Sequence, residues 1–278
     1  MAHRAHGRGR YPRHGVSVDE HTINLDESPV FYRTADAPGV PVLYLHGIPT
    51  SSDDWAEFLA RTGGIAPDLI GFGRSGKGGH LDYSLAGLTG FLERFLAEIR
   101  INKVKLVAHD WGVWVGLTLA RRHPQQIEQL VLINAPPLFD GFAWPRLARI
   151  WRTPWIGEGL MGSTTRGMLA RTLRHGSVNP AAWPDDRVAK VWDQFDQGTQ
   201  RAILRLVRST KVHPPAPTPA PQTLIIWGDR DPWYPPALAD AYATLLPGAT
   251  IHRLSDAGHW PWLDRSDLVE RVATFLEE

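Results

Sequence analysis

The chain has 278 residues, of which 43% are hydrophobic and 21% charged, and its formal net charge is +1. This length suits one large α/β domain or two smaller ones, and the composition is that of a globular protein. The near-neutral charge argues against nucleic acid as a partner, and the lack of cysteine excludes disulfides, thiolate nucleophiles and cysteine-based metal sites.

The first fifteen residues differ from the rest, because they carry four arginines and no acidic residue. They lack the apolar segment of a secretory signal, so we expect residues 1–15 to form a flexible basic N-terminus. No stretch reaches the roughly 18 apolar residues of a membrane span. Together with the absence of cysteine, this leads us to expect a cytoplasmic protein without a membrane partner.

Short β-branched runs alternate with amphipathic patterns over residues 16–136, which predicts a largely parallel sheet flanked by helices. Apolar spacings of three and four predict a helix over 84–100, and a second helix over 111–123 ends before Pro124. The apolar runs predict strands at residues 16–25, 28–35, 40–47, 103–110 and 127–136.

This alternation stops after residue 136 and resumes at residue 222. Residues 137–212 hold helical segments rich in Trp, Arg and Pro, and the next nine residues, 213–221, contain five prolines, which predicts a stiff connector. The chain therefore divides into an α/β core of residues 16–136 and 216–278 and a helical insertion over 137–215. The remaining strands and helices are predicted at 222–231, 235–247, 250–259 and 267–278.

Asp110 stands where a predicted strand meets a predicted helix, in the sequence AHDWG (residues 108–112). Small residues at both ends of this pentapeptide permit a nucleophile elbow, a sharp turn that lifts the central side chain above the sheet. A carboxylate there attacks saturated carbon and forms an alkyl ester, whereas a serine would favour acyl transfer. The alternative interpretation is that Asp110 only caps the following helix.

His259 and Asp231 follow later strands, in the chain order nucleophile, acid, histidine. His259 comes just after the last predicted strand and would take a proton from the hydrolytic water, although a lone histidine is more often structural. Two aspartates end the strand at 222–231. We favour Asp231 as the acid that orients the histidine, and Asp229 as a brace of the turn.

The sequence HGIP (residues 46–49) ends another strand and precedes a predicted helix. Such a turn can present the backbone N–H of Ile48 toward the elbow, where it would join the N–H of Trp111 in a two-donor oxyanion hole. The alternative is an ordinary strand-loop-helix connection with Ser52 or Asp53 as the N-cap.

Taken together, these stretches resemble the α/β-hydrolase superfamily, in the branch of haloalkane dehalogenases and epoxide hydrolases. The resemblance implies a mostly parallel eight-stranded sheet flanked by helices, with residues 137–212 as a helical cap over the pocket. It also implies that Asp110 attacks carbon, that His259 activates water, and that no cofactor takes part. The histidines show no ligand spacing on a shared face, so we expect no metal. The matching segments are HGIPTSS, PDLIGFGRSGK, VAHDWG, WGDRDPW and AGHWPWLD, across residues 46–264.

Tyrosine and tryptophan in the cap distinguish the two activities. Epoxide hydrolases protonate the opening epoxide with cap tyrosines, and none of the six tyrosines of this chain lies between 137 and 212. Dehalogenases hold the departing halide with N–H donors, and the indole of Trp111 resembles one. One group takes its second donor from Asn in HGNP, where this chain has Ile48. Another takes it from a cap tryptophan, for which Trp144 is our candidate, although each cap tryptophan can instead pack the core.

We therefore expect a hydrolase that acts at saturated carbon through an alkyl ester of Asp110, with a small apolar haloalkane and water as the leading substrates. Epoxide hydrolysis to vicinal diols is the alternative, because a cap hydroxyl or a water could replace the missing tyrosine. A third hypothesis is a ligand-binding protein that keeps the fold without turnover.

Overall fold

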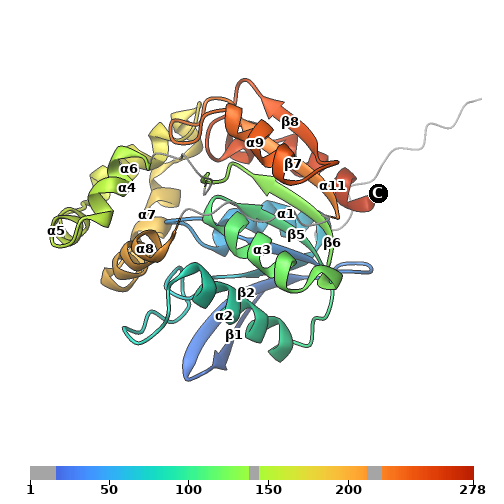
Figure 1. The fold of residues 1–278 in the computed structure, drawn as a ribbon, viewed down its shortest axis with the longest axis horizontal. Helices are drawn as coiled ribbons and strands as arrows, with labels where there is room; N and C mark the ends of the chain where they lie inside the picture. Colours follow the sequence, from blue (N-terminus) through green and yellow to red (C-terminus); the bar gives the residue numbers. More distant parts are fainter. Residues whose placement is uncertain (1–16, 138–143, 212–220) are drawn as a thin grey trace, which may run out of the picture.

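The computed structural model describes residues 17–137, 144–211 and 221–278, in which helices pack on both faces of a twisted eight-stranded sheet (Figure 1). The strand order is β1-β2-β4-β3-β5-β6-β7-β8. Strands β1, β2 and β4 pair antiparallel, and the pairs from β4 through β8 are parallel. The predicted mostly parallel α/β fold is therefore confirmed.

The sequence predicts all of these strands except β4, which has only four residues. Its sequence, GIAP, carries neither alternation nor a β-branched run. The central strands β3, β5, β6 and β7 are buried along almost their whole length, which explains why they read as continuous apolar runs. The strands are β1 Asp19–Leu25, β2 Ser28–Ala35, β3 Val42–Leu45, β4 Gly64–Pro67, β5 Val104–His109, β6 Ile127–Ile133, β7 Gln222–Gly228 and β8 Thr250–Leu254.

The helices of the core begin and end close to the predicted positions. The longest of them, α2, begins where the side chain of Ser84 accepts the N–H of Gly87, and it buries Leu88, Leu92 and Phe95 on one face. The core helices are η1 Ser52–Trp55, α1 Ala56–Thr62, α2 Leu85–Glu98, α3 Trp111–Arg122, η2 Pro124–Gln126, α9 Ala237–Leu245, α10 Pro261–Asp264 and α11 Leu268–Glu277.

The helical insertion leaves the sheet after β6, returns to it at β7, and lies over one end of the strands (Figure 1). Its exact boundaries, 137 and 215, stay a prediction. The basic N-terminus and most of the proline-rich connector lie outside the described residues. The described cap helices are α4 Arg146–Arg152, α5 Ile156–Gly162, α6 Arg166–His175, η3 Pro180–Ala182, α7 Asp185–Gln194 and α8 Gln197–Ser209.

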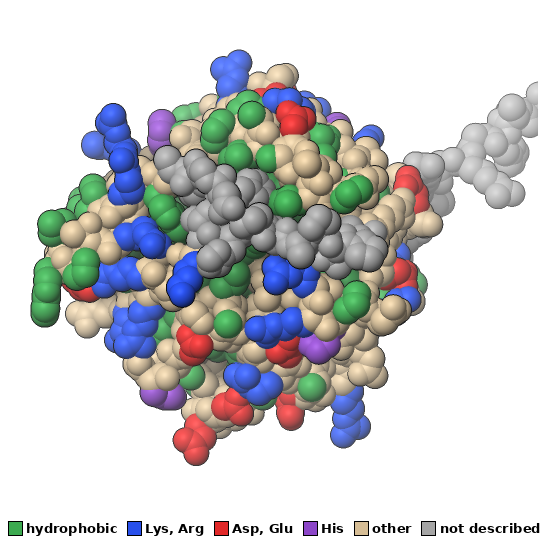
Figure 2. Space-filling model, in the orientation of Figure 1, with side chains coloured by type: hydrophobic (Ala, Val, Ile, Leu, Met, Phe, Trp, Pro, Cys, Tyr) green, Lys and Arg blue, Asp and Glu red, His purple; other side chains and the backbone are tan. Residues whose placement is uncertain are grey.

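The surface carries charges of both signs, which is consistent with the near balance of basic and acidic residues in the chain. Figure 2 shows basic and acidic side chains interspersed over the face turned to the viewer, with apolar side chains at the tip where α5 lies. At this tip Trp155 is 87% exposed and Ile156 61% exposed. Among the described helices, none is long and apolar enough to cross a membrane.

Two glycines allow the elbow between β5 and α3 to form. Asp110 has the left-handed backbone angle φ of 49°, which strains a non-glycine residue. A Cβ at Gly112 would lie 2.5 Å from the carbonyl oxygen of Leu45 on β3, and a Cβ at Gly47 would lie 2.5 Å from the Cβ of Asp110. The turn and the end of β3 therefore approach so closely that a side chain fits at neither position.

Replacing Gly112 with alanine should lower the free energy of unfolding by about 1–3 kcal/mol, because the new methyl group meets backbone that cannot move aside. Urea denaturation of the purified variant measures this change. The control is Gly90→Ala on α2, where the nearest atom to an added Cβ is the flexible end of Arg94 at 3.4 Å. That variant should keep or slightly gain stability. Equal losses in both variants would contradict the argument.

Candidate active site

Asp110 is 2% exposed, and donors from two separate elements hold its carboxylate. Its Oδ2 accepts the backbone N–H of Ile48 at 3.0 Å, and its Oδ1 accepts the hydroxyl of Tyr234 at 2.9 Å. The backbone N–H of Trp111 also favours the ionised carboxylate. Both backbone groups expected of an oxyanion hole, those of Ile48 and Trp111, therefore act on the carboxylate of Asp110.

Burial raises the pKa of Asp110 above its ordinary value. The charge of His259, the N–H groups of Ile48 and Trp111 and the hydroxyl of Tyr234 act in the opposite direction without cancelling the effect of burial. The result is a carboxylate with little water around it and fixed donors on both oxygens. Such a group suits attack on an apolar substrate, because little solvent has to be displaced.

His259 and Asp231 form a buried pair beside this carboxylate. The Nδ1 of His259 lies 2.7 Å from Oδ2 of Asp231, and the two residues are 2% and 7% exposed. The Oδ1 of Asp231 accepts the backbone N–H groups of Trp233 at 2.8 Å and Tyr234 at 3.0 Å. With Nδ1 donating to this fixed carboxylate, the lone pair of a neutral His259 is on Nε2, where it can accept a proton from water.

The pKa of His259 is raised although burial alone would lower it. The charge and hydrogen bond of Asp231 act against burial, and the charges of Asp110 and Asp54 add to them. An imidazolium formed during a reaction would therefore be stabilised by three carboxyl groups. This is the electrostatic setting that a general base requires.

Asp229 points away from the histidine. It forms an ion pair with Arg253 at 3.1 Å and lies at the sheet surface, while Asp231 faces the site. Of the two aspartates, Asp231 is the one that contacts His259, and its role as the acid stays a prediction.

Sequence reasoning missed two polar residues of the site. Asn134 directly follows β6 with a φ of 35°, donates from Nδ2 to Asp231 at 2.7 Å, and accepts the N–H of Gly228 at 2.9 Å. A polar residue at the carboxyl end of a central strand was the available signal. Tyr234 comes from the loop after β7, and its position three residues beyond Asp231 carries no pattern that predicts a contact with Asp110.

A cavity of about 200 Å³ lies between the core and the cap, and Asp110 and His259 both line it. Most of its other described walls are apolar. Trp111 and Trp144 line it together, with nearly parallel rings whose centroids are 6.2 Å apart. The guanidinium of Arg152 lies 4.7 Å from the centre of the Trp144 ring. The cap tryptophan chosen from the sequence is therefore beside Trp111 at the cavity.

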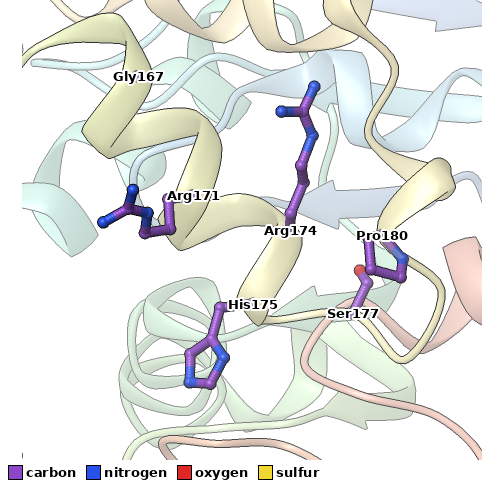
Figure 3. A pocket seen from close by; sticks show the side chains of 6 residues that line it. All are labelled: Gly167, Arg171, Arg174, His175, Ser177 and Pro180. Atoms are coloured by element: carbon purple, nitrogen blue, oxygen red, sulfur yellow. The ribbon is translucent and has the colours of Figure 1, made fainter.

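A second hollow of about 570 Å³ lies on the cap, lined by Arg171, Arg174, His175 and Ser177 among others (Figure 3). Figure 3 shows Arg174 and His175 extending in opposite directions, and Arg174 forms an ion pair with Asp185 at 2.7 Å. These basic groups do not converge on one ligand. Among the described residues, no three His, Asp or Glu side chains gather as a candidate metal site.

The loop that carries His259 is bound to the cap. The backbone N–H of His259 donates to the carbonyl of Gly176 at the end of α6, at 2.6 Å. The carboxylate of Asp264 accepts the N–H of Gly258 in this loop at 2.8 Å, and those of Val178 and Asn179 in the cap at 3.1 and 2.9 Å. The position of His259 thus depends on contacts with both the core and the cap.

Asp54 is a second buried carboxyl group near the site. It is 9% exposed, and its Oδ2 has no hydrogen-bond partner among the described residues. Burial raises its pKa to about 7, although a hydrogen bond from Thr50 and the charges of Arg187 and His259 partly offset this effect. The folded protein therefore binds a proton at Asp54 more tightly than the unfolded chain does.

Asp54→Asn should stabilise the protein above pH 7. The raised pKa of Asp54 makes wild-type stability fall as pH rises from about 4 to about 7, because the folded state must then ionise a buried acid. Asparagine removes this decline, so the free energy of unfolding of Asp54→Asn should exceed that of the wild type by a few kcal/mol at pH 8. Urea denaturation at pH 5 and pH 8 measures the difference.

The neighbouring Asp53 provides the control. Its carboxylate pairs with Arg33 and Arg74, each at 2.6 Å, and its pKa is lowered despite burial. Asp53→Asn should therefore lose stability at pH 8. A loss at pH 8 in both variants would refute the assignment for Asp54.

Comparisons with known proteins identify relatives of the whole chain. The profile described as alpha/beta hydrolase fold matches residues 40–266. A haloalkane dehalogenase of Mesorhizobium japonicum is 30% identical, and the match covers 92% of this chain and 90% of that protein.

Solved structures show the same overall similarity. The crystal structure of haloalkane dehalogenase DbeA from Bradyrhizobium elkani has a TM-score of 0.81 at 26% identity, covering 94% of this chain and 98% of that one. An epoxide hydrolase, CorEH, also has a TM-score of 0.81 but only 18% identity, covering 94% of this chain and 99% of that one. This second likeness is one of fold.

Proposed function

The chain belongs to the α/β-hydrolase family, in the branch of haloalkane dehalogenases and epoxide hydrolases, and from this we propose that it is a cofactor-independent hydrolase that releases halide from small haloalkanes. One observation carries the proposal. The elbow presents a carboxylate, that of Asp110, instead of a hydroxyl, with the N–H of Ile48 3.0 Å from one oxygen and His259 on the same apolar cavity.

In the first step, Oδ1 of Asp110 attacks the carbon that bears the halogen. The new carbon–oxygen bond forms as the carbon–halogen bond breaks, and the halide departs with the bonding electrons. Trp111 and Trp144 are the candidates to hold the halide through their indole N–H groups, since an indole donates without carrying a charge. The product of this step is an alkyl ester of Asp110.

In the second step, Nε2 of His259 takes a proton from water as the water oxygen attacks Cγ of Asp110, the carbonyl carbon of the ester. The negative charge then builds on Oδ2, which accepts the N–H of Ile48, and we assign the N–H of Trp111 as the second donor to this charge. The bond between this carbon and Oδ1 breaks, and the alcohol leaves with the proton from His259. The second proton of the water passes to solvent as Asp110 returns to its carboxylate form. Asp231 stabilises the imidazolium between these two transfers.

Epoxide hydrolysis is the second candidate. The site does hold a tyrosine hydroxyl, that of Tyr234, but it comes from the core and donates to Oδ1 of Asp110, the attacking oxygen. The similarity to CorEH in fold is compatible with either activity.

The first test is a comparison of 1-bromobutane with styrene oxide, with bromide and diol measured separately. Bromide release without diol supports the proposed dehalogenase, and diol without bromide would establish the epoxide hydrolase instead. Asp110→Ala should lower turnover at least about a thousand-fold, because the nucleophile is removed.

The control for this test is Asp229→Asn, which alters the aspartate that faces Arg253 and should keep wild-type turnover. Full activity in Asp110→Ala would refute the mechanism. Binding of both compounds without any product would instead support the non-catalytic hypothesis.

A second test uses pH. His259 must be unprotonated to accept a proton, and the charge and hydrogen bond of Asp231 raise its pKa against burial, so kcat should fall as pH decreases through the pKa of His259 in the alkyl enzyme. Asp231→Asn removes the main groups that raise this pKa, so the midpoint should move to lower pH while the plateau rate drops about 10²–10⁴-fold. Profiles of kcat from pH 5 to 9 measure both. An unchanged or higher midpoint would contradict the pairing of the two residues.

A further inference from the structure

We propose that the hydroxyl of Tyr234 acts in the second half of the reaction, by donating a hydrogen bond to the oxygen that leaves Asp110 as the product alkoxide. This role rests on the proposed function, because it requires an alkyl ester on Asp110. It makes Tyr234 a catalytic residue for ester hydrolysis and not for the attack on the substrate.

The hydroxyl is held in place before any substrate arrives. It lies 2.9 Å from Oδ1 of Asp110, and Tyr234 is 8% exposed. The backbone carbonyl of Tyr234 accepts the indole N–H of Trp227 at 3.1 Å, and the backbone N–H of Tyr234 donates to Asp231 at 3.0 Å. Its ring packs at an angle of 62° on the imidazole of His259. Backbone and ring together therefore direct the hydroxyl to one oxygen.

That oxygen is the one that reacts. Oδ2 of Asp110 accepts the N–H of Ile48, so it is the oxygen on which the oxyanion forms. The other oxygen, Oδ1, is then the one that bonds to the substrate carbon and later departs in the alcohol. Tyr234 donates to Oδ1.

The charge on Oδ1 changes in opposite directions in the two steps. During the attack a carboxylate oxygen becomes an ester oxygen, so its hydrogen bond from Tyr234 weakens and opposes the step. During hydrolysis the ester oxygen becomes an alkoxide, so the same bond strengthens and favours the step. Only an interaction that is stronger in a transition state than before it accelerates the reaction.

The proton balance needs nothing more from Tyr234 than this hydrogen bond. His259 takes a proton from water and returns it to the departing oxygen, so the tyrosine keeps its own proton throughout. Burial and the carboxylates of Asp110 and Asp231 raise the pKa of Tyr234 well above its ordinary value, so the hydroxyl remains a donor at neutral pH.

The position of the Tyr234 hydroxyl suits contact with the ester oxygen and does not suit protonation of an epoxide. An in-line displacement places the leaving atom on the side of the carbon opposite to the attacking oxygen. The Tyr234 hydroxyl lies within hydrogen-bond distance of the attacking oxygen, on the near side of that carbon. It therefore contacts the ester oxygen rather than the group that leaves in the first step.

Tyr234→Phe tests the proposal, with rapid-quench measurement of bromide release from 1-bromobutane and intact mass measurement of the butyl ester. Alkylation should proceed at the wild-type rate or faster, while ester hydrolysis slows about 10–100-fold, as expected for a lost hydrogen bond to a charged oxygen. The butyl adduct should accumulate, and kcat and KM should fall together.

Tyr242→Phe is the matched control. It removes another buried tyrosine hydroxyl, one that donates to the carbonyl of Pro136 at 2.7 Å, and both rates should stay at wild-type values. The reference for trapped ester is His259→Gln, in which the butyl adduct should persist.

Wild-type hydrolysis of the ester in Tyr234→Phe, or an equal loss in both steps, would overturn the role of Tyr234 while leaving the proposed function standing. The absence of any butyl adduct in His259→Gln, together with no bromide from the wild-type protein, would overturn the proposed function and this inference with it.

Discussion

The close approach of the β3 end to the turn between β5 and α3 determines the rest of the site. Because neither Gly47 nor Gly112 leaves room for a Cβ, the backbone after β3 can run directly beside the carboxylate of Asp110. That proximity puts the N–H of Ile48 on one oxygen and buries the acid under strained backbone. The chemistry thus depends on a steric fit between two backbone segments before it depends on any side chain.

Electrostatic interactions then couple the buried residues of the site. The charges of Asp231, Asp110 and Asp54 all raise the pKa of His259 against the effect of its burial. Asn134 and the backbone after β7 fix Asp231, so its charge stays where the imidazole needs it. The Oδ2 of Asp54 has no hydrogen-bond partner among the described residues, and the raised pKa of Asp54 reflects a carboxyl group that burial favours in the neutral form.

Most of the fold and the elbow could be predicted, because both leave strong local patterns. The buried strands read as apolar runs, and Asp110, His259 and Asp231 each follow such a run at the carboxyl edge of the sheet. Strand β4 was missed because four residues without periodicity form a strand only through their neighbours. Tyr234 could not be predicted, since its contact with an aspartate 124 positions away depends on how two loops meet in space.

The contact between Gly176 and the backbone of His259 has a consequence for how such proteins diversify. Insertions over a conserved sheet are often regarded as interchangeable modules that alter only which molecules enter the cavity. Here, exchanging the insertion between relatives would also exchange a backbone contact that anchors His259. A chimera would need its crossover points chosen so that the turn carrying Gly176 and the acceptor Asp264 come from one parent.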